Sequence, residues 1–283
     1  MFLKEKMIIK KRYPLKKITT IGLGGYCKEF VCPEDEAELM ETIHKDPLII
    51  GNGSNICFIT EFYNRPIVSL KRMKKYIDLD NKYISCSGNV SCTRLAKYLH
   101  DNRQPGYEFL YGIPGTIAGA ISMNAGAFDS EILPCVYSID LLNENGMVYT
   151  LKNNEISYSY RKSNIDKKSI IISVKLFKQV INFDERLLDN LNQKRKTSQP
   201  TNQLSCGCIF KNPSGDYAAR LIDSALLKGS RVGGIYISHK HSNYFINDGS
   251  GTHTDFLVLL KRVKEVVASK FNIKLDEEVI LLK

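Results

Sequence analysis

The sequence predicts an α+β fold organised in two domains. Short strand and helix patterns alternate through the first half of the chain, with glycine-rich loops at strand ends. A second group of strands and helices follows the polar stretch TSQPTNQ at 197–203, which is typical of a linker. The 283 residues exceed one typical domain, and 43% hydrophobic with 25% charged residues is the composition of a globular protein.

Strands and helices follow each other in the first half. Apolar stretches bounded by turn residues predict strands at 29–33, 47–51, 66–70 and, as a hairpin turning at Asp80 and Asn81, at 75–88. A helix is predicted at 33–45, because Pro33 lies near its start and acidic residues follow in the first turn. Ser91 is typical of an N-cap and predicts a second helix at 92–103.

The middle of the chain continues this pattern. Two strands are predicted at 136–151 around an Asn-Gly turn, and a third at 169–177. The charged segment 184–196 predicts a helix that leads to the linker.

The C-terminal part has its own elements. We expect a helix at 217–229 that Gly229 ends, strands around 232–238 and 244–247, and a closing strand at 277–282. A helix from Asp255 to Phe271 is predicted by an apolar face at helical spacing, formed by Phe256, Leu259, Leu260, Val263, Val266 and Val267.

The formal charge of +10 suggests binding to nucleic acid. However, the Lys and Arg residues are spread through the chain, and no aromatic RNA-binding motif or zinc-finger spacing accompanies them. A basic surface also attracts anionic small substrates, and a solvated lysine-rich surface is equally compatible with this composition. We expect no nucleic-acid partner.

Composition also bears on the compartment. No segment approaches 18 consecutive apolar residues, and the basic N-terminus lacks the apolar region of a secretory signal, so we expect a cytoplasmic protein without a membrane partner. The eight cysteines form no CxxC pair, and most are expected to be reduced, buried residues.

Two glycine-rich motifs occur early in the chain. GLGGYC at 22–27 has Cys27 where a dinucleotide fingerprint needs glycine, so a tight turn is the better interpretation. GNGSN at 51–55 directly follows an apolar strand, where consecutive amides can form a nest for phosphate oxygens. A surface turn remains the alternative for this second motif.

The stretch YGIPGTIAGAISMNAGA at 111–127 strengthens the anion interpretation. Pro114 is well placed to open a helix, Gly115 would leave its N-terminal amides bare, and Gly119 between two alanines leaves no bulk. Close helix packing is the alternative. Two such loops about 60 residues apart favour a cofactor that carries a pyrophosphate.

Three further positions are candidates for chemistry. Arg161, which follows alternating aromatic and polar residues as on a strand, is either a solvated charge or a guanidinium directed at a carboxylate or enolate oxygen. Cys206 and Cys208 are spaced too closely for a typical zinc or disulfide pair, which leaves one of them as a thiol proton donor and predicts no metal. Of Glu277 and Glu278, strand alternation would turn one inward.

Taken in order, these motifs resemble the UDP-N-acetylenolpyruvoylglucosamine reductase family of flavoenzymes, in its compact form without an inserted tyrosine loop. The resemblance runs from TTIGLGGYCKEF through GNGSNI, GIPGTIAGAISMNAGA, YSYRKS and SCGCIFKNP to EEVILL. It implies a two-subdomain FAD-binding domain of the vanillyl-alcohol-oxidase type at 18–184, after an N-terminal segment 1–17. A smaller α+β substrate-binding domain is implied at 185–283.

The resemblance also implies a reaction and the residues that perform it. NADPH would reduce non-covalently bound FAD, flavin N5 would deliver hydride to C3 of the enolpyruvyl group, and UDP-N-acetylmuramate would form. Arg161 matches the family's enolate-stabilising arginine, Glu278 its C-terminal glutamate, and Cys208 its proton donor, a serine in most members. Tyr160 and Asn212 match positions that line the substrate pocket.

The resemblance places the FAD in the two glycine-rich loops. The expected cofactor-binding residues are Gly51, Asn52, Gly53, Ser54, Asn55, Gly112, Pro114, Gly115, Thr116, Gly119, Asn124, Ala125 and Gly126. One departure concerns the linker, where Ser198 replaces a lysine found in many members and Lys196 lies nearby. We expect a monomer that acts on a sugar nucleotide, and another FAD-dependent oxidoreductase of the same fold is the alternative.

Overall fold

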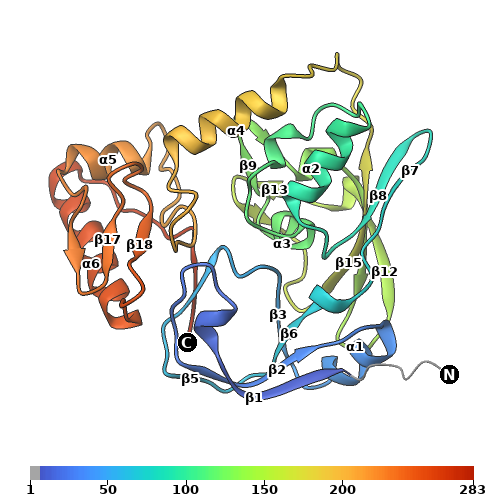
Figure 1. The fold of residues 1–283 in the computed structure, drawn as a ribbon, viewed down its shortest axis with the longest axis horizontal. Helices are drawn as coiled ribbons and strands as arrows, with labels where there is room; N and C mark the ends of the chain where they lie inside the picture. Colours follow the sequence, from blue (N-terminus) through green and yellow to red (C-terminus); the bar gives the residue numbers. More distant parts are fainter. Residues whose placement is uncertain (1–6) are drawn as a thin grey trace. The chain divides into compact units, whose positions relative to one another are not determined.

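The computed structural model describes residues 7–283, and these divide into two compact units that interleave along the sequence (Figure 1). Unit 1 comprises the described residues up to Lys11, Glu29–Asn52 and Arg65–Lys194; unit 2 comprises Arg12–Lys28, Gly53–Asn64 and Arg195–Lys283. Residues 1–6 of the expected N-terminal segment lie outside the described part, and the linear domain boundaries stay a prediction.

The larger sheet of unit 1 has five antiparallel strands. Their order is β12 (Val148–Lys152), β11 (Val136–Leu142), β15 (Ile170–Phe177), β8 (Tyr83–Ser87) and β7 (Ile77–Leu79). The predicted hairpin at Asp80 and Asn81 is confirmed, since β7 and β8 pair across that turn. The Asn-Gly turn between β11 and β12 is confirmed in the same way.

Two helices cover this sheet. Helices α2 (Cys92–Asp101) and α3 (Ile117–Ser122) lie beside β8 and β15 in Figure 1. Their apolar side chains join those of the sheet in one buried core that includes Leu95, Leu99, Ile117 and Ile121. Ser91 caps α2 as predicted, because its hydroxyl accepts a hydrogen bond from the Arg94 amide.

A second sheet contributes parallel strand pairs to unit 1. Strand β6 (Ile67–Ser69) pairs with β3 (Leu48–Ile50) and with the unit 1 part of β2 (Tyr26–Cys32). Helix α1 (Glu36–Ile43) connects β2 to β3, and it begins later than the Pro33 start that the sequence predicts. The reason is that the Asp35 side chain accepts from the Glu38 amide and so forms the N-cap.

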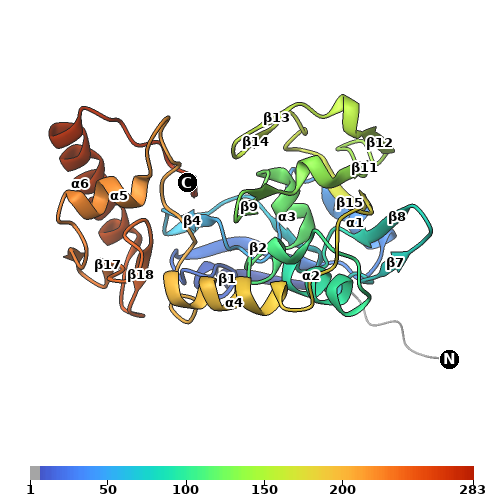
Figure 2. The same ribbon diagram turned by 90° about the horizontal axis from the view of Figure 1, so that it is seen from above.

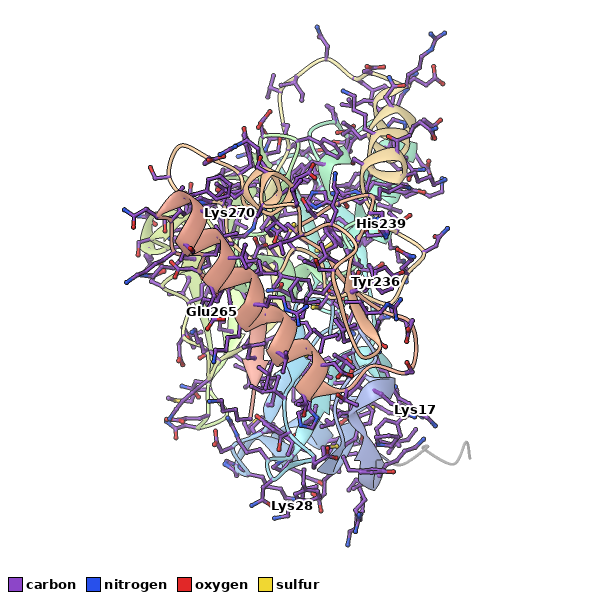
Figure 3. The ribbon with its side chains drawn as sticks, turned by 90° about the vertical axis from the view of Figure 1, so that its left-hand side faces the viewer. Lys17, Lys28, Tyr236, His239, Glu265 and Lys270 are labelled. Atoms are coloured by element: carbon purple, nitrogen blue, oxygen red, sulfur yellow. The ribbon has the colours of Figure 1, made fainter. Side chains whose placement is uncertain are left out.

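Unit 2 combines a small antiparallel sheet with two helices. The sheet order is β16 (Arg231–Val232), β17 (Ile235–Ile237) and β18 (Phe245–Asn247). Helix α6 (His253–Phe271) is prominent in Figure 3, where Glu265 and Lys270 are labelled on it. Of its predicted apolar face, Phe256, Leu259, Leu260, Val263 and Val267 are buried.

Helix α5 (Ala218–Ser224) is shorter than predicted. It ends five residues before Gly229, because Leu226 adopts a left-handed conformation with φ of 61° and turns the chain away from the helix. The closing strand β19 (Ile280–Leu282) pairs in parallel with β4 (Ile56–Phe58), a partner more than 220 residues earlier.

The remaining elements are short, apart from helix α4 (Leu187–Ser198) and strand β1 (Ile8–Pro14). The short strands are β5 (Phe62–Tyr63), β9 (Gly126–Ala127), β10 (Ser130–Glu131), β13 (Tyr158–Ser159) and β14 (Lys162–Ser163). Single 3-10 turns occur at Leu15–Lys17, Leu70–Arg72, Glu108–Leu110, Leu133–Cys135 and Asn153–Glu155. Among residues 7–283, no helix has the length and apolarity needed to cross a membrane.

Candidate functional site

Arg161 lies in the tight turn of a hairpin in unit 1. It follows β13 and precedes β14, and its φ of 56° is in the left-handed region. The sequence suggested a strand position instead; the strand pattern is interrupted here because the chain reverses at Tyr160 and Arg161. A non-glycine residue in this conformation costs about 1–3 kcal/mol, and such strain is common at functional positions.

The guanidinium of Arg161 is held by the neighbouring β9 segment, next to which the hairpin is drawn in Figure 2. Its Nη1 donates to the carbonyl of Asn124 and its Nη2 to the carbonyl of Gly126, each at 3.1 Å. The Glu131 carboxylate lies 3.9 Å from Nη1, and the Tyr160 ring centre lies 4.8 Å from the guanidinium carbon. These contacts fix the plane of the positive charge, as recognition of a carboxylate requires.

Asn124 is the support of this arrangement. It is fully buried with φ of 47°, and its side-chain nitrogen donates to Glu131 at 2.7 Å and to the carbonyl of Ser159 at 3.2 Å. Its side-chain oxygen accepts from the amide of Leu133. Sequence reasoning assigned Asn124 to the cofactor and missed Glu131, since an acidic residue in a polar turn gives no signal of such a contact.

The two glycine-rich loops, at 51–55 and 111–127, meet within unit 1. A Cβ atom on Gly51 would lie 2.6 Å from the hydroxyl oxygen of Thr116. Only glycine therefore allows the loops to approach so closely.

The start of α3 differs from the prediction. Thr116, not Pro114, precedes the helix, and its hydroxyl accepts from the Gly119 amide at 3.2 Å. The amides of Ile117 and Ala118 donate to the carbonyls of Val90 and Gly88, each at 2.8 Å. The expectation that Gly115 leaves these amides bare is wrong, because the loop before α2 takes their hydrogen bonds.

Gly119 offers a different kind of opening. It is exposed inside a helix, and a Cβ there would meet only the Thr116 hydroxyl, at 3.4 Å. Because a Cβ atom has room at this position, no packing contact in the described chain requires a glycine. Glycine is nevertheless present, although it is less favourable than alanine within a helix by about 0.5–1 kcal/mol. The bare backbone surface at Gly119 fits a large ligand that lies against it.

The second part of the GNGSN loop belongs to unit 2. Gly53 has φ of 64°, and a Cβ on it would lie 2.0 Å from the carbonyl oxygen of Ile18. Within residues 7–283, the amides of Gly53 and Ser54 donate to no protein acceptor. Such amides fit phosphate oxygens.

Cys206 and Cys208 have different environments. Cys206 is fully buried, and its burial raises the pKa of the thiol well above the ordinary value of 9.0, so it is an inert core residue as predicted. Cys208 is half-buried and pairs across an isolated antiparallel bridge with Tyr244. Both thiols are free of disulfide bonds.

Glu278 is joined to the cysteine segment through the backbone. Its amide donates to the carbonyl of Ile209, the residue after Cys208, at 2.8 Å. The adjacent Glu277 instead forms an ion pair with Lys264 at 2.7 Å. Both glutamates are half-buried, so alternation alone does not separate them.

The candidate substrate residues lie in different units. Tyr160 in unit 1 is 43% exposed beside Arg161. Asn212 in unit 2 accepts the Ala218 amide at 3.1 Å and so caps the start of α5. Unit 2 also contains a pocket of about 280 Å³, lined by Lys196, Pro200, Thr201, Asn202, Gln203 and Lys240.

Comparisons with known proteins extend over nearly the whole chain. Residues 28–152 match the profile described as FAD binding domain, and residues 199–282 match that of the UDP-N-acetylenolpyruvoylglucosamine reductase C-terminal domain. A reductase of that name from Fusobacterium nucleatum is 33% identical over 95% of this chain and 97% of its own length. One from Caldanaerobacter subterraneus is 35% identical, covering 94% and 91%.

A solved structure gives the same result for the fold. The UDP-N-acetylenolpyruvylglucosamine reductase from Thermus caldophilus matches with a TM-score of 0.85 at 29% identity, over 98% of this chain and 100% of that one. The predicted fold class, an FAD-binding domain with a smaller α+β domain, is confirmed.

Proposed function

Because the chain belongs to the UDP-N-acetylenolpyruvoylglucosamine reductase family, we propose that it reduces UDP-N-acetyl-enolpyruvoylglucosamine to UDP-N-acetylmuramate with electrons from NADPH. One observation within unit 2 carries the proposal most directly. The backbone pairing around Ile209 holds a thiol and a carboxylate, Cys208 and Glu278, on adjoining segments.

The two glycine-rich loops fit non-covalent FAD. The close contact of Gly51 with Thr116, the open backbone at Gly119, and the Gly53 and Ser54 amides are the features that support binding there. FAD bound in this way supplies hydride transfer from N5 to C3 of the enolpyruvyl group. The proposed contacts include Asn52, Asn55, Gly112, Pro114, Gly115, Ala125 and Gly126, in a FAD domain at 18–184.

Arg161 would stabilise the charge that develops on the substrate. Addition of hydride at C3 leaves an enolate whose negative charge spreads to the carboxylate. A guanidinium fixed by two backbone carbonyls needs no reorganisation when this charge appears. Glu278 would act with Arg161 near the carboxylate.

Cys208 would protonate C2. A cysteine thiol is mostly protonated at neutral pH, yet it is a far stronger acid than a serine hydroxyl. Cys208 is half-buried, so it is only partly surrounded by water. The proton passes from sulfur to C2, and a thiolate remains.

Unit 2 also offers groups for the nucleotide part of the substrate. Lys196 and Lys240 line the same pocket, and the Lys240 ammonium donates to the Lys196 carbonyl at 2.7 Å. Two ammonium groups there suit a diphosphate. They would take the place of the lysine that many family members have at the position of Ser198. Tyr160 and Asn212 would contact the sugar nucleotide, with 185–283 as the substrate domain.

The test is purification with FAD followed by an assay with NADPH and the enolpyruvyl sugar nucleotide. We expect a yellow protein, NADPH oxidation that depends on the substrate, and a product heavier by two hydrogens. A protein that does not bind FAD would contradict the proposal. Flavin binding with NADPH oxidation only by oxygen would favour another FAD-dependent oxidoreductase.

A further inference from the structure

Tyr244 lies directly opposite Cys208. The two residues are partners in an isolated antiparallel bridge, and the Ile209 amide donates to the carbonyl of Asn243 at 2.9 Å beside it. Side chains of directly opposed residues lie on the same face of a strand pair. The Tyr244 and Cys208 side chains accordingly extend from the same face of this pair, and the thiol contributes to the raised pKa of Tyr244.

The backbone around Tyr244 holds it in this position. Its carbonyl accepts from the Ser238 amide at 2.9 Å, and its own amide donates to the carbonyl of His241 at 3.0 Å. The His241 ring packs edge-on against the tyrosine ring, with 4.8 Å between the centres. The half-buried ring therefore has little freedom to turn its hydroxyl away from the sulfur.

The charged and titratable groups around this pair come from several elements. Arg195 of α4, Glu278 before β19 and Cys208 itself act on the Tyr244 hydroxyl, and Cys208 also acts on Cys206. Burial of the ring is the largest effect and raises the pKa of Tyr244 well above its usual value of 10.0. The hydroxyl consequently keeps its proton over the neutral range and is available as a donor.

We propose that Tyr244 is a positioning residue for Cys208: its hydroxyl donates to the sulfur, directs the S–H bond away from itself, and stabilises the thiolate. This inference rests on the proposed function. In the step concerned, the S–H bond breaks, the proton bonds to C2 of the substrate, and the electron pair stays on sulfur. Tyr244 keeps its own proton, and solvent later restores the thiol.

The first test is Tyr244→Phe in the FAD-loaded enzyme, with the two half-reactions measured separately. We expect NADPH to reduce the flavin at the normal rate. Reoxidation by the enolpyruvyl substrate should fall about tenfold, the change produced by one pKa unit. The alkaline limb of its pH profile should move upward, because a thiol without the donated hydrogen bond loses its proton at higher pH.

Tyr236→Phe is the matched control. Tyr236, labelled in Figure 3, lies on the adjacent strand β17, and its hydroxyl accepts from Gln203 at 3.1 Å. That variant should leave both half-reactions unchanged. In a Cys208→Ala background, Tyr244→Phe should cause no further loss, since its effect passes through the sulfur.

The second test does not depend on turnover. Alkylation of Cys208 by iodoacetamide in the FAD-loaded enzyme, followed by peptide mass spectrometry, should be about tenfold slower in Tyr244→Phe at neutral pH. Normal alkylation together with normal reoxidation in this variant would overturn the inference. An equal loss from Tyr244→Phe in the Cys208→Ala background would overturn it as well.

These outcomes are separable from failure of the proposed function. Normal reoxidation in Cys208→Ala would remove the thiol from the reaction altogether. A large loss in Cys208→Ala with no effect of Tyr244→Phe would leave the proposed function intact and refute only the role of Tyr244.

Discussion

Asn55 and Glu278 are 223 positions apart in sequence, and the Asn55 side-chain nitrogen donates a 3.1 Å hydrogen bond to the Glu278 carbonyl. The Asn55 carbonyl in turn accepts from the Ile280 amide at 2.9 Å. The end of the GNGSN loop at 51–55 therefore fixes the backbone of Glu278, the proposed catalytic carboxylate. These two hydrogen bonds of Asn55 also fix the register of β19 against β4.

Asn55→Ala should remove the side-chain hydrogen bond to the Glu278 carbonyl. We expect a loss of about 1 kcal/mol in unfolding free energy, the usual value for one hydrogen bond, and slower substrate-dependent flavin reoxidation. Urea unfolding and stopped-flow absorbance measure the two effects. Asn102→Ala is the control, because Asn102 makes a similar bond to the Tyr98 carbonyl at an exposed helix end. Wild-type stability and kinetics in Asn55→Ala would show that the hydrogen bond from Asn55 to Glu278 has no role.

Gly119→Ala separates stability from cofactor binding. Alanine should stabilise the FAD-free protein by about 0.5–1 kcal/mol, because glycine is unfavourable inside a helix. The added methyl should weaken FAD binding roughly tenfold if the cofactor lies against this backbone. Fluorescence titration with FAD gives the affinity, and Ser122→Ala on the exposed side of the same helix is the control. Unchanged FAD affinity in Gly119→Ala would place the cofactor elsewhere.

Arg161→Lys keeps the charge and removes the fixed geometry. A lysine cannot hold the two-carbonyl contact to Asn124 and Gly126 with a planar group. We expect reoxidation by substrate to slow on the order of 100-fold, with flavin reduction by NADPH unaffected. Arg65→Lys, at an exposed pair with Asp46, should behave as wild type. Near-normal turnover in Arg161→Lys would mean that charge alone is sufficient there.

We expect two buried thiols to lower the free energy of unfolding at alkaline pH. Burial raises the pKa of Cys57 and of Cys86 from the ordinary 9.0 to about 12. Above pH 9 the unfolded chain releases these protons and the folded chain keeps them, so stability is complete below pH 9 and falls as pH rises toward 12. Each thiol contributes up to about 1.4 kcal/mol per pH unit.

Urea unfolding between pH 7 and pH 10.5 checks this expectation. Cys57→Ala and Cys86→Ala should each be less stable at pH 7 but should lose stability less steeply above pH 9. An equally steep decline in both variants would assign the alkaline sensitivity to other groups.

Local patterns in the sequence predicted most of the elements. Ser91 is the N-cap of α2, and the apolar face of α6 is buried, because both signals lie within a few residues. The errors occurred where a single residue decided a helix end: the Asp35 side chain delays the start of α1, and the left-handed backbone of Leu226 ends α5 early. Pairing of β19 with β4 has no local signal, since the partners are distant in sequence.

The candidate site shows the same limit. Motif order selected Arg161, Cys208 and Glu278, but it did not reveal what holds them. Asn124 and Glu131 support the arginine through part-buried contacts, and Tyr244 lies opposite Cys208 on another segment. Such partners are set by folding of the chain and not by their spacing in the sequence.

The central claim is that Cys208 gives a proton to the substrate after the flavin has been reduced. Stopped-flow absorbance of FAD-loaded Cys208→Ala tests it most directly, with Cys208→Ser as the companion variant. Flavin reduction by NADPH should be normal in both, while reoxidation by the enolpyruvyl substrate should nearly disappear in Cys208→Ala and remain substantial in Cys208→Ser. Normal reoxidation in Cys208→Ala, or equal loss of both half-reactions, would contradict the account.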